Sequence, residues 1–286
     1  MESFPRIAFF GSPDIAVWVL EELVQANIIP ALIVTNPDTP QGRKMLMTPT
    51  PVAQWADAHH IETFKPTSLR NDETMTTLET AECELFIVAA YGKIIPERIL
   101  DIPAHKTLNM HPSLLPNLRG ASPIRSAILE DMNPTGVTIM ELTTGMDEGP
   151  ILAQEEVQIT PKDWPLRGTQ LDRLLAQKGG ALLAELLPRW VRGELTPVEQ
   201  DHTKATYSKK ITKEMGELIL ADDPYTNLLK IRAFDGWPGT YFFVTKNDVK
   251  VRVKIVDAEL HTDGSLNILR VIPEGKKEMS YEDFMR

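Results

Sequence analysis

Two side chains that could act on a carbonyl group, Asn109 and His111, lie two positions apart in the segment NMHPSLLP. The sequence predicts a strand from Thr107 to Met110, and residues two apart on a strand point to the same side. The pair would project from the carboxyl end of that strand, where open α/β sheets bind their ligands. An amide donor beside an imidazole can stabilise a developing oxyanion and move a proton. The alternative is a pair at a sheet edge that only hydrogen-bonds to a loop, and spacing alone does not choose between the two.

A second loop, TTGMDEGP at residues 143–150, carries adjacent acids between two glycines and follows the β-rich run GVTIMEL. A carboxylate from this loop, placed near His111, would hold the imidazole in one tautomer. On the residues alone, a solvated acidic turn is the favoured interpretation.

Several common chemistries have no motif in this chain. The first predicted turn from strand to helix is GSPD at 11–14, without the glycine-rich pattern of dinucleotide-binding proteins, and no P-loop occurs. H-E-x-x-H and paired cysteines are absent, and the single Cys83 excludes an intramolecular disulfide. We therefore expect no metal, no NAD and no ATP.

The composition is that of an acidic globular protein. The 286 residues include 42% hydrophobic and 24% charged residues, with a formal net charge of −10. That charge argues against a protein that coats DNA. No apolar run approaches the ~20 residues of a membrane span, and the start resembles no signal peptide. We expect one or two domains in the reducing cytoplasm, with no membrane and no DNA partner.

Strands and helices alternate along the first two thirds of the chain. The predicted strands are 6–11, 31–35, 85–90, 107–110, 136–142 and 151–159, and the predicted helices are 15–25, 52–59, 123–129 and 166–190. Ser12 is the predicted N-cap of the first helix. The alternation predicts an α/β fold with a mainly parallel sheet. The proline-rich segment 36–51 is predicted as a long loop.

The pattern changes after residue 191. Residues 192–208 are polar and rich in turn formers, which is typical of a linker, and the runs 241–245 and 249–258 alternate as in a hairpin. This indicates a small β-rich second domain. Residues 203–286 hold 14 Lys and Arg against 13 Asp and Glu, while the rest of the chain is acidic. An anionic partner is compatible with that difference, and so are two domains of different composition.

These motifs together resemble the methionyl-tRNA formyltransferase family, a branch of the 10-formyltetrahydrofolate-dependent formyltransferases. The superfamily core is N-x-H-x-S-L-L-P at 109–116 with Asp147 in the loop after GVTIM. The tRNA branch is indicated by RGASPI at 119–124, GVTIM at 136–140, PDxPxGR at 37–43 and RAFxxWP at 232–238. The resemblance extends over nearly the whole chain.

The resemblance implies a cytoplasmic enzyme that transfers a formyl group from 10-formyltetrahydrofolate to the α-amine of methionyl-initiator tRNA, for translation initiation. It implies a Rossmann-like formyltransferase domain at 1–191, a linker at 192–208, and a small, shortened, OB-like β-barrel at 209–286 that supports the tRNA. We expect a monomer that binds folate and tRNA without a metal.

The family's catalytic asparagine, histidine and aspartate fall on Asn109, His111 and Asp147. By this resemblance, Asn109 and His111 would stabilise the tetrahedral oxyanion, and His111 would help to deliver a proton to N10 of the leaving folate. Asp147 would orient His111 and, through water, assist in taking the proton of the amine. The implied folate contacts are Phe10, Ala90, Tyr91, Gly92, Ile94, Ser113, Leu114, Leu115, Pro116, Thr143 and Gly145. Phe10, Tyr91 and Ile94 could equally be packing residues.

In the family a loop of the first domain enters the acceptor end of the tRNA. Here that loop spans 36–51, and it continues after Arg43 as KMLM, which is less basic and more apolar than the family pattern. A strand segment that usually contains Pro-Gly is missing between Ala258 and Asn267. The candidate tRNA contacts are Arg43, Lys44, Lys209, Lys210, Lys250, Arg252 and Lys254, with Lys213 and Lys246 in addition. On a strand, the cations 250, 252 and 254 would share one face while Val249, Val251 and Val253 pack inward.

Two alternatives stay open. A sugar-nucleotide N-formyltransferase shares the catalytic residues and the domain order, and the contexts of Arg43 and ASPI at 121–124 favour tRNA over it. A non-catalytic RNA or folate binder is the other alternative. The complete set of Asn109, His111 and Asp147 argues against that second possibility.

Overall fold

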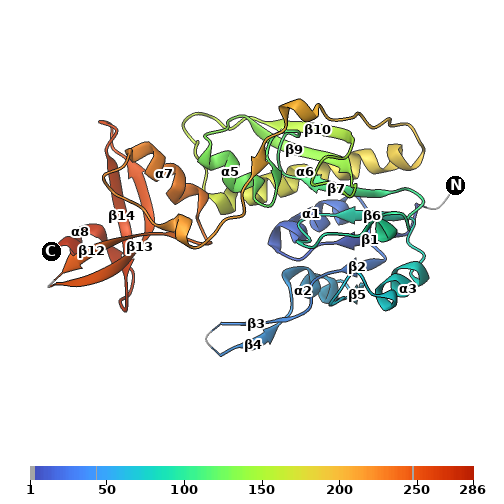
Figure 1. The fold of residues 1–286 in the computed structure, drawn as a ribbon, viewed down its shortest axis with the longest axis horizontal. Coiled ribbons are helices and arrows are strands. Elements are labelled where there is room, and N and C mark those ends of the chain that lie inside the picture. The colour runs from blue at the N-terminus through green and yellow to red at the C-terminus, as the bar shows by residue number, and fades with distance from the viewer. Residues whose placement is uncertain (1–3, 43, 247) are drawn as a thin grey trace. The chain divides into compact units, whose positions relative to one another are not determined.

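The computed structural model describes residues 4–42, 44–246 and 248–286 (Figure 1). Its internal contacts divide the chain into two compact units. Unit 1 comprises Met1–Gly120, Gly136–Val157 and Arg173–Tyr207, and unit 2 comprises Ala121–Thr135, Gln158–Asp172 and Ser208–Arg286. The domain bounds expected at 191 and 208 stay a prediction.

Unit 1 is built around a mainly parallel sheet, as predicted. Its strands are β1 (Ile7–Phe10), β2 (Leu32–Val34), β5 (Glu62–Phe64), β6 (Leu85–Val88), β7 (Thr107–His111), β9 (Thr135–Glu141) and β10 (Ile151–Val157). They lie in the order β10-β9-β7-β6-β1-β2-β5. The pairs from β7 through β6 and β1 to β5 are parallel, whereas β9 is antiparallel to β7.

Helices cover both faces of this sheet. Ile7 and Phe9 of β1 pack with residues of α1 (Asp14–Gln25), α2 (Pro51–Ala58) and α6 (Gly168–Val191). Ala8 and Phe10 point the other way and pack with α3 (Asp72–Thr80) and α4 (Glu97–Leu100). A strand that is buried on both faces needs a continuous apolar run rather than an alternating one, which is what β1 and β6 show.

The strand order reverses at β1, because β2 and β5 lie on one side of it and β6 and β7 on the other. Ligands of open α/β sheets bind beside the carboxyl ends of the strands at such a reversal. The residues that follow β6 and β7 are therefore in the position where a site is expected.

Two local predictions were wrong. The predicted loop at 36–51 contains an antiparallel hairpin of β3 (Thr39–Gln41) and β4 (Leu46–Thr48), in which Pro40 is tolerated because the ladder has only two strands. Ser12 does not cap α1, whose N-cap is Pro13 without a side-chain hydrogen bond. Instead, the Ser12 hydroxyl oxygen accepts from the Thr35 hydroxyl at 3.2 Å and from the Asn36 N–H at 3.2 Å. Ser12 thus ties the ends of β1 and β2 together.

Unit 2 contains the small β-rich part that the sequence predicts near the C-terminus. Its sheet is antiparallel, in the order β12-β13-β14-β15, and these strands are Thr240–Lys246, Val249–Leu260, Leu266–Pro273 and Met279–Ser280. The α-helices that lie wholly within the unit are α5 (Pro123–Leu129), α7 (Pro224–Ala233) and α8 (Tyr281–Met285), and the first five residues of α6 belong to it as well. Phe242, Val253 and Val271 are among the residues of its apolar core. The remaining pair of short strands, β8 (Arg119–Gly120) and β11 (Tyr207–Ser208), lies beside the site described below.

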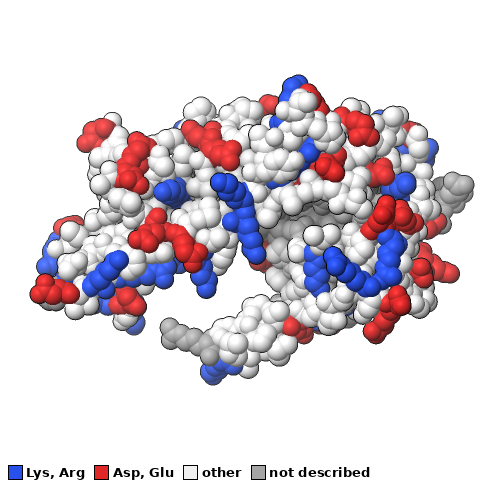
Figure 2. All heavy atoms as spheres, in the orientation of Figure 1, with Lys and Arg blue, Asp and Glu red and all other residues white. Residues whose placement is uncertain are grey.

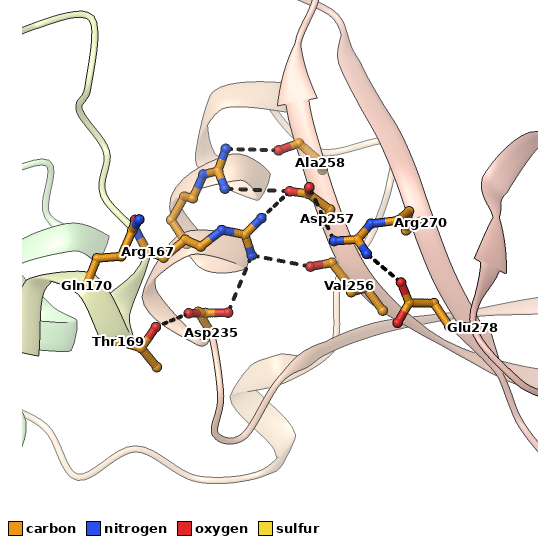
Figure 3. A network of polar contacts seen from close by, with 10 residues as sticks. Arg167, Thr169, Gln170, Asp235, Val256, Asp257, Ala258, Arg270 and Glu278 are labelled. Atoms are coloured by element: carbon orange, nitrogen blue, oxygen red, sulfur yellow. Dashed lines mark hydrogen bonds and ion pairs between the residues drawn. The ribbon is translucent and has the colours of Figure 1, made fainter. Parts of the chain in front are cut away.

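An ion-pair network in unit 2 is centred on Asp257 (Figure 3). A register shift between β13 and β14 at this residue puts its carboxylate within reach of three guanidinium groups. Arg167 donates to it, Arg232 Nη1 lies 3.7 Å from Oδ1, and Arg270 Nη2 lies 3.7 Å from Oδ2. Arg232 also donates to the Ala258 carbonyl at 3.2 Å. The arginine of the RAFxxWP motif therefore serves the structure of unit 2.

The Asp257→Ala variant is expected to lose about 2 kcal/mol of unfolding free energy, because three arginines would keep their charge without a central carboxylate. This is less than for a fully buried pair, since the Asp257 side chain is 21% exposed. Urea denaturation measures the loss. The matched control is Glu259→Ala, an exposed acid on the same strand, which should stay within about 0.5 kcal/mol of the wild type. Equal effects of the two substitutions would contradict the assignment.

Candidate active site

Strand β7 places Asn109 and His111 on one face at its carboxyl end. Asn109 lies between Val88 of β6 and Met140 of β9, and His111 lies opposite Thr138 of β9. Both are buried, with 8% and 4% of their surface exposed. Figure 2 shows a hollow in unit 1 close to β6 and β7. The strand geometry thus agrees with the expected projection of the pair from one sheet edge.

The imidazole of His111 has a defined orientation. Its Nε2 lies 3.0 Å from the Leu118 carbonyl oxygen, which can only accept, so Nε2 carries a hydrogen. Its Nδ1 lies 3.7 Å from Asp147 Oδ1. That distance is longer than a hydrogen bond. Nδ1 is therefore the ring nitrogen that faces the carboxylate and is available to a reacting group.

Asp147 reaches His111 by an indirect path. Because β9 is antiparallel to β7, its last residue, Glu141, lies opposite Leu108, near the start of β7 and away from His111. The following loop returns along β7 and brings the Asp147 carboxylate back to the level of His111. There its Oδ2 accepts the Gly120 N–H at 2.7 Å, and the backbone φ of Asp147 is +51°. This left-handed conformation is uncommon for a residue other than glycine and has to be held by its surroundings.

Hydrogen bonds from side chains of β9 and β10 hold the loop of Ser113 to Pro116. The Thr138 hydroxyl donates to the Ser113 carbonyl at 2.6 Å and accepts the Leu115 N–H at 3.1 Å. Gln154 donates to the Leu115 carbonyl at 2.8 Å. Ser113 is buried, and its hydroxyl donates to the Asn117 carbonyl at 2.6 Å. These bonds give the loop one conformation before any ligand arrives.

Gly136, the first residue of GVTIM, is explained by this loop. A Cβ at this position would lie 2.3 Å from the Glu155 carbonyl oxygen and 2.5 Å from Leu114 Cδ2. Only glycine leaves space for Leu114 on one side and the backbone of β10 on the other.

The turn after β6 divides into exposed and buried residues. Ala90, Gly92 and Ile94 are exposed, and the Ile94 side chain has 82% of its surface in solvent. Tyr91 is 2% exposed and Phe10 is fully buried, with the two rings 5.5 Å apart in an edge-to-face arrangement. The structure thus places Phe10 and Tyr91 in the core, where they pack, and it leaves the other three open to a ligand. Thr143 and Gly145 are partly buried in the Asp147 loop.

The Tyr91 hydroxyl is buried without a hydrogen-bond partner among the described residues, and burial raises the pKa of Tyr91 to about 12. The Tyr91→Phe variant should therefore keep or gain unfolding free energy, by up to about 1 kcal/mol. Urea denaturation measures it. Tyr225→Phe is the control, because the Tyr225 hydroxyl donates to Asp131 at 2.8 Å and its removal should cost about 1 kcal/mol. A larger loss in Tyr91→Phe than in Tyr225→Phe would show that the Tyr91 hydroxyl has a partner.

Residues 5–187 match the family described as formyl transferase. The methionyl-tRNA formyltransferase of Sulfurihydrogenibium sp. (strain YO3AOP1) is 39% identical over 90% of this chain and 82% of its own length. Those of Bacillus licheniformis and Thermus thermophilus are 38% identical over 98% of this chain and over 94% and 95% of their own lengths. This chain belongs to the methionyl-tRNA formyltransferase family.

Solved structures share the fold of this formyltransferase at much lower identity. A sugar N-formyltransferase from Shewanella sp. FDAARGOS_354 aligns with a TM-score of 0.64 at 18% identity, over 96% of this chain and 100% of its own. HypX from Aquifex aeolicus in complex with tetrahydrofolic acid aligns with a TM-score of 0.66 at 18% identity, over 99% of this chain and 47% of its own.

The candidate tRNA residues of this formyltransferase lie in both units. Arg43 lies outside the described residues, and Lys44 is exposed in the turn between β3 and β4. Lys209 and Lys210 are exposed after β11. The apolar residues Met45, Leu46 and Met47 of the hairpin are exposed as well, at 67%, 65% and 63%.

The three cations of β13 share one exposed face, and Figure 2 shows Lys and Arg gathered over β12 and β13. Lys250 Nζ lies 4.0 Å from the centre of the Phe243 ring, and the Arg252 guanidinium lies 3.6 Å from that of Tyr241. Val253 is buried on the opposite face, but Val249 is 61% exposed. The prediction that Val249 packs inward was therefore wrong, because β13 extends beyond the apolar core at that end.

No helix among the described residues has the length and apolar character that a membrane span requires. Within the same residues, no three His, Cys, Asp or Glu side chains are grouped as metal ligands.

Proposed function

We propose that this chain transfers a formyl group from 10-formyltetrahydrofolate to the α-amine of methionyl-initiator tRNA. The observation that carries this proposal is His111 Nδ1 facing Asp147 Oδ1 at 3.7 Å, with Asn109 on the same face of β7. The names of relatives at 38–39% identity over most of both chains support it.

Each of the three side chains has a separate part in this reaction. The Asn109 amide donates to the formyl oxygen as that oxygen gains negative charge. The charged imidazole of His111 donates its Nδ1–H to the same formyl oxygen, and it then gives this proton to N10 of the leaving folate. Asp147 stabilises the charged imidazole and, through water, takes the proton that the attacking amine releases. The Leu118 carbonyl keeps the ring in the orientation that this requires.

The surroundings fit a folate. 10-Formyltetrahydrofolate, when bound, supplies the formyl group. The exposed residues Ala90, Gly92 and Ile94 offer backbone groups and an apolar side chain, and the loop from Ser113 to Pro116 is already ordered by Thr138. Backbone and apolar contacts of this kind are typical of small-molecule sites. We include the partly buried Leu114, Thr143 and Gly145 in this folate site, and Leu115 through its backbone alone, because its side chain is 3% exposed. We omit the buried Phe10 and Tyr91 from direct contact.

The exposed cations of β13 are the part of unit 2 that we assign to the tRNA. Phosphate groups attract Lys and Arg without regard to sequence, and aromatic rings beside them offer surfaces on which bases can stack. The chain as a whole is acidic. Binding of a polyanion therefore has to depend on such local clusters, together with Lys44, Lys209 and Lys210.

One assay tests the proposal and its rivals. Labelled formyl transfer from 10-formyltetrahydrofolate is measured in parallel with methionyl-initiator tRNA, methionyl-elongator tRNA and amino-sugar nucleotides as acceptors. We expect rapid transfer to the initiator tRNA alone. Faster transfer to an amino-sugar nucleotide would favour the activity named for the structural neighbour from Shewanella. No transfer to any acceptor would favour a non-catalytic binder.

A further inference from the structure

The loop that carries Asp147 is held by a glutamine far away in the sequence. The Gln200 side-chain amide donates to the Asp147 carbonyl at 2.9 Å and to the Gly149 carbonyl at 2.7 Å. Gln200 is 5% exposed, so these bonds form away from solvent. Asp147 lies outside the strands, so no β-ladder stabilises its left-handed backbone conformation. The hydrogen bonds from Gln200 stabilise it instead.

Gln200 is itself fixed by a buried arginine. Its Oε1 accepts from Arg119 Nε at 3.1 Å and from Nη2 at 2.7 Å. Arg119 is 1% exposed, and its Nη1 lies 4.0 Å from the Glu148 carboxylate. A guanidinium that donates twice to one oxygen allows the amide little rotation. The donor end of Gln200 is therefore aimed at the Asp147 loop.

The segment of residues 118–120, which contains Arg119, also positions His111. Leu118 accepts from His111 Nε2, Arg119 holds Gln200, and the N–H of Gly120 donates to Asp147 Oδ2. The segment is anchored in turn by Thr206, whose hydroxyl accepts the Leu118 N–H at 2.8 Å. Residues 118–120 thus contact both partners of the pair that lies 3.7 Å apart.

A closed ring of interactions passes through Asp147. It runs from the Asp147 carboxylate to the Gly120 N–H, through the backbone to the Arg119 side chain, and through Gln200 to the Asp147 carbonyl. Both ends of the aspartate are fixed relative to one arginine. We propose that Gln200, held by Arg119, is a positioning residue that sets the distance between Asp147 and His111.

This inference rests on the proposed function, because it needs Asp147 and His111 to act in the reaction. Catalysis is sensitive to such placement, and an error of about 1 Å can cost about 10²-fold in rate. Gln200 does not reach the reacting groups itself. Its loss should therefore lower kcat and leave the KM values for folate and tRNA within about twofold.

The test compares Gln200→Glu and Gln200→Met with the wild type. Glutamate keeps an acceptor for Arg119 but has no N–H to donate to the Asp147 loop, and methionine has neither. We expect kcat to fall about 10- to 100-fold in both variants. Thermal unfolding is measured first, and Gln200→Glu carries the test if Gln200→Met is unfolded at the assay temperature. The control is Gln158→Ala, an exposed glutamine of unit 2 that bonds to Asn133 and should keep wild-type kcat.

A double-variant cycle separates positioning from a general structural effect. In the Asp147→Asn background, Gln200→Glu should lower kcat by less than twofold, because the carboxylate it positions is already gone. Near-normal turnover of Asp147→Asn alone would overturn the proposed role of Asp147, and this inference with it. A slow Asp147→Asn variant combined with wild-type kcat in folded Gln200→Glu would overturn only the inference. The inference would also be overturned if the two losses of kcat multiplied in the double variant, because Gln200 would then act independently of the Asp147 carboxylate.

Discussion

Turnover of the His111→Ala variant is expected to fall at least about 10²-fold below the wild type, the usual scale for losing a general acid–base group or an oxyanion donor. The imidazole is buried, with Nε2 bound to the Leu118 carbonyl and Nδ1 facing Asp147. Alanine removes the group that donates from Nδ1, and no other titratable side chain lies on the same face of β7. Steady-state formyl transfer with both substrates saturating measures the loss.

The control for this substitution is His261→Ala, an exposed histidine in the turn between β13 and β14, which should keep wild-type turnover. Asn109→Ala should lose turnover on the same scale as His111→Ala, because it removes a donor from the same face. Near-normal turnover of folded His111→Ala would disprove its assignment as the acid–base group.

The part of the site on β7 could be predicted because it depends only on local geometry. Once Thr107 to His111 is a strand, the period of two places Asn109 and His111 on one face. The apolar runs of β1 and β6 likewise predict buried parallel strands without any knowledge of their neighbours.

The contacts around Asp147 could not be predicted in the same way. The position of Asp147 depends on the antiparallel direction of β9 and on a loop that returns along β7. The groups that hold it, Gly120 and Gln200, lie 27 and 53 residues away in the chain. No periodicity links such separations, and the polar segment around Gln200 has the composition of a linker.

The folate contacts show a further limit of sequence patterns. Phe10 and Ile94 are both apolar residues near the ends of predicted strands, yet one is fully buried and the other is 82% exposed. Phe10 is the last residue of β1 and points into the core with Phe86, whereas Ile94 belongs to an irregular segment after the turn. The side to which each points is set by packing between segments that are distant in sequence.

Reversing the charges of Lys250, Arg252 and Lys254 to glutamate is expected to raise the KM for methionyl-initiator tRNA by roughly 10²-fold at physiological salt. Three phosphate contacts contribute about this factor through the release of counterions. The dependence of KM on salt should flatten, while kcat and the KM for folate stay near the wild type. Initial rates at several salt concentrations measure both effects.

The matched control reverses three exposed arginines of unit 1, Arg173 and Arg189 of α6 and Arg192 in the turn that follows it, and so changes the net charge by the same amount. If long-range repulsion by the whole protein controlled binding, both triple variants would raise the KM equally. If the face of β13 contacts phosphates, only the β13 variant loses affinity and salt slope, because salt screens the interaction between exposed charges beyond about 10 Å at this ionic strength.

Glutamate also removes the stacking of Lys250 on Phe243 and of Arg252 on Tyr241, which costs about 0.5–1 kcal/mol per pair. Thermal unfolding of the variant must therefore be measured beside its KM. A folded β13 variant with an unchanged KM and salt slope would leave the recognition of tRNA to the hairpin of unit 1.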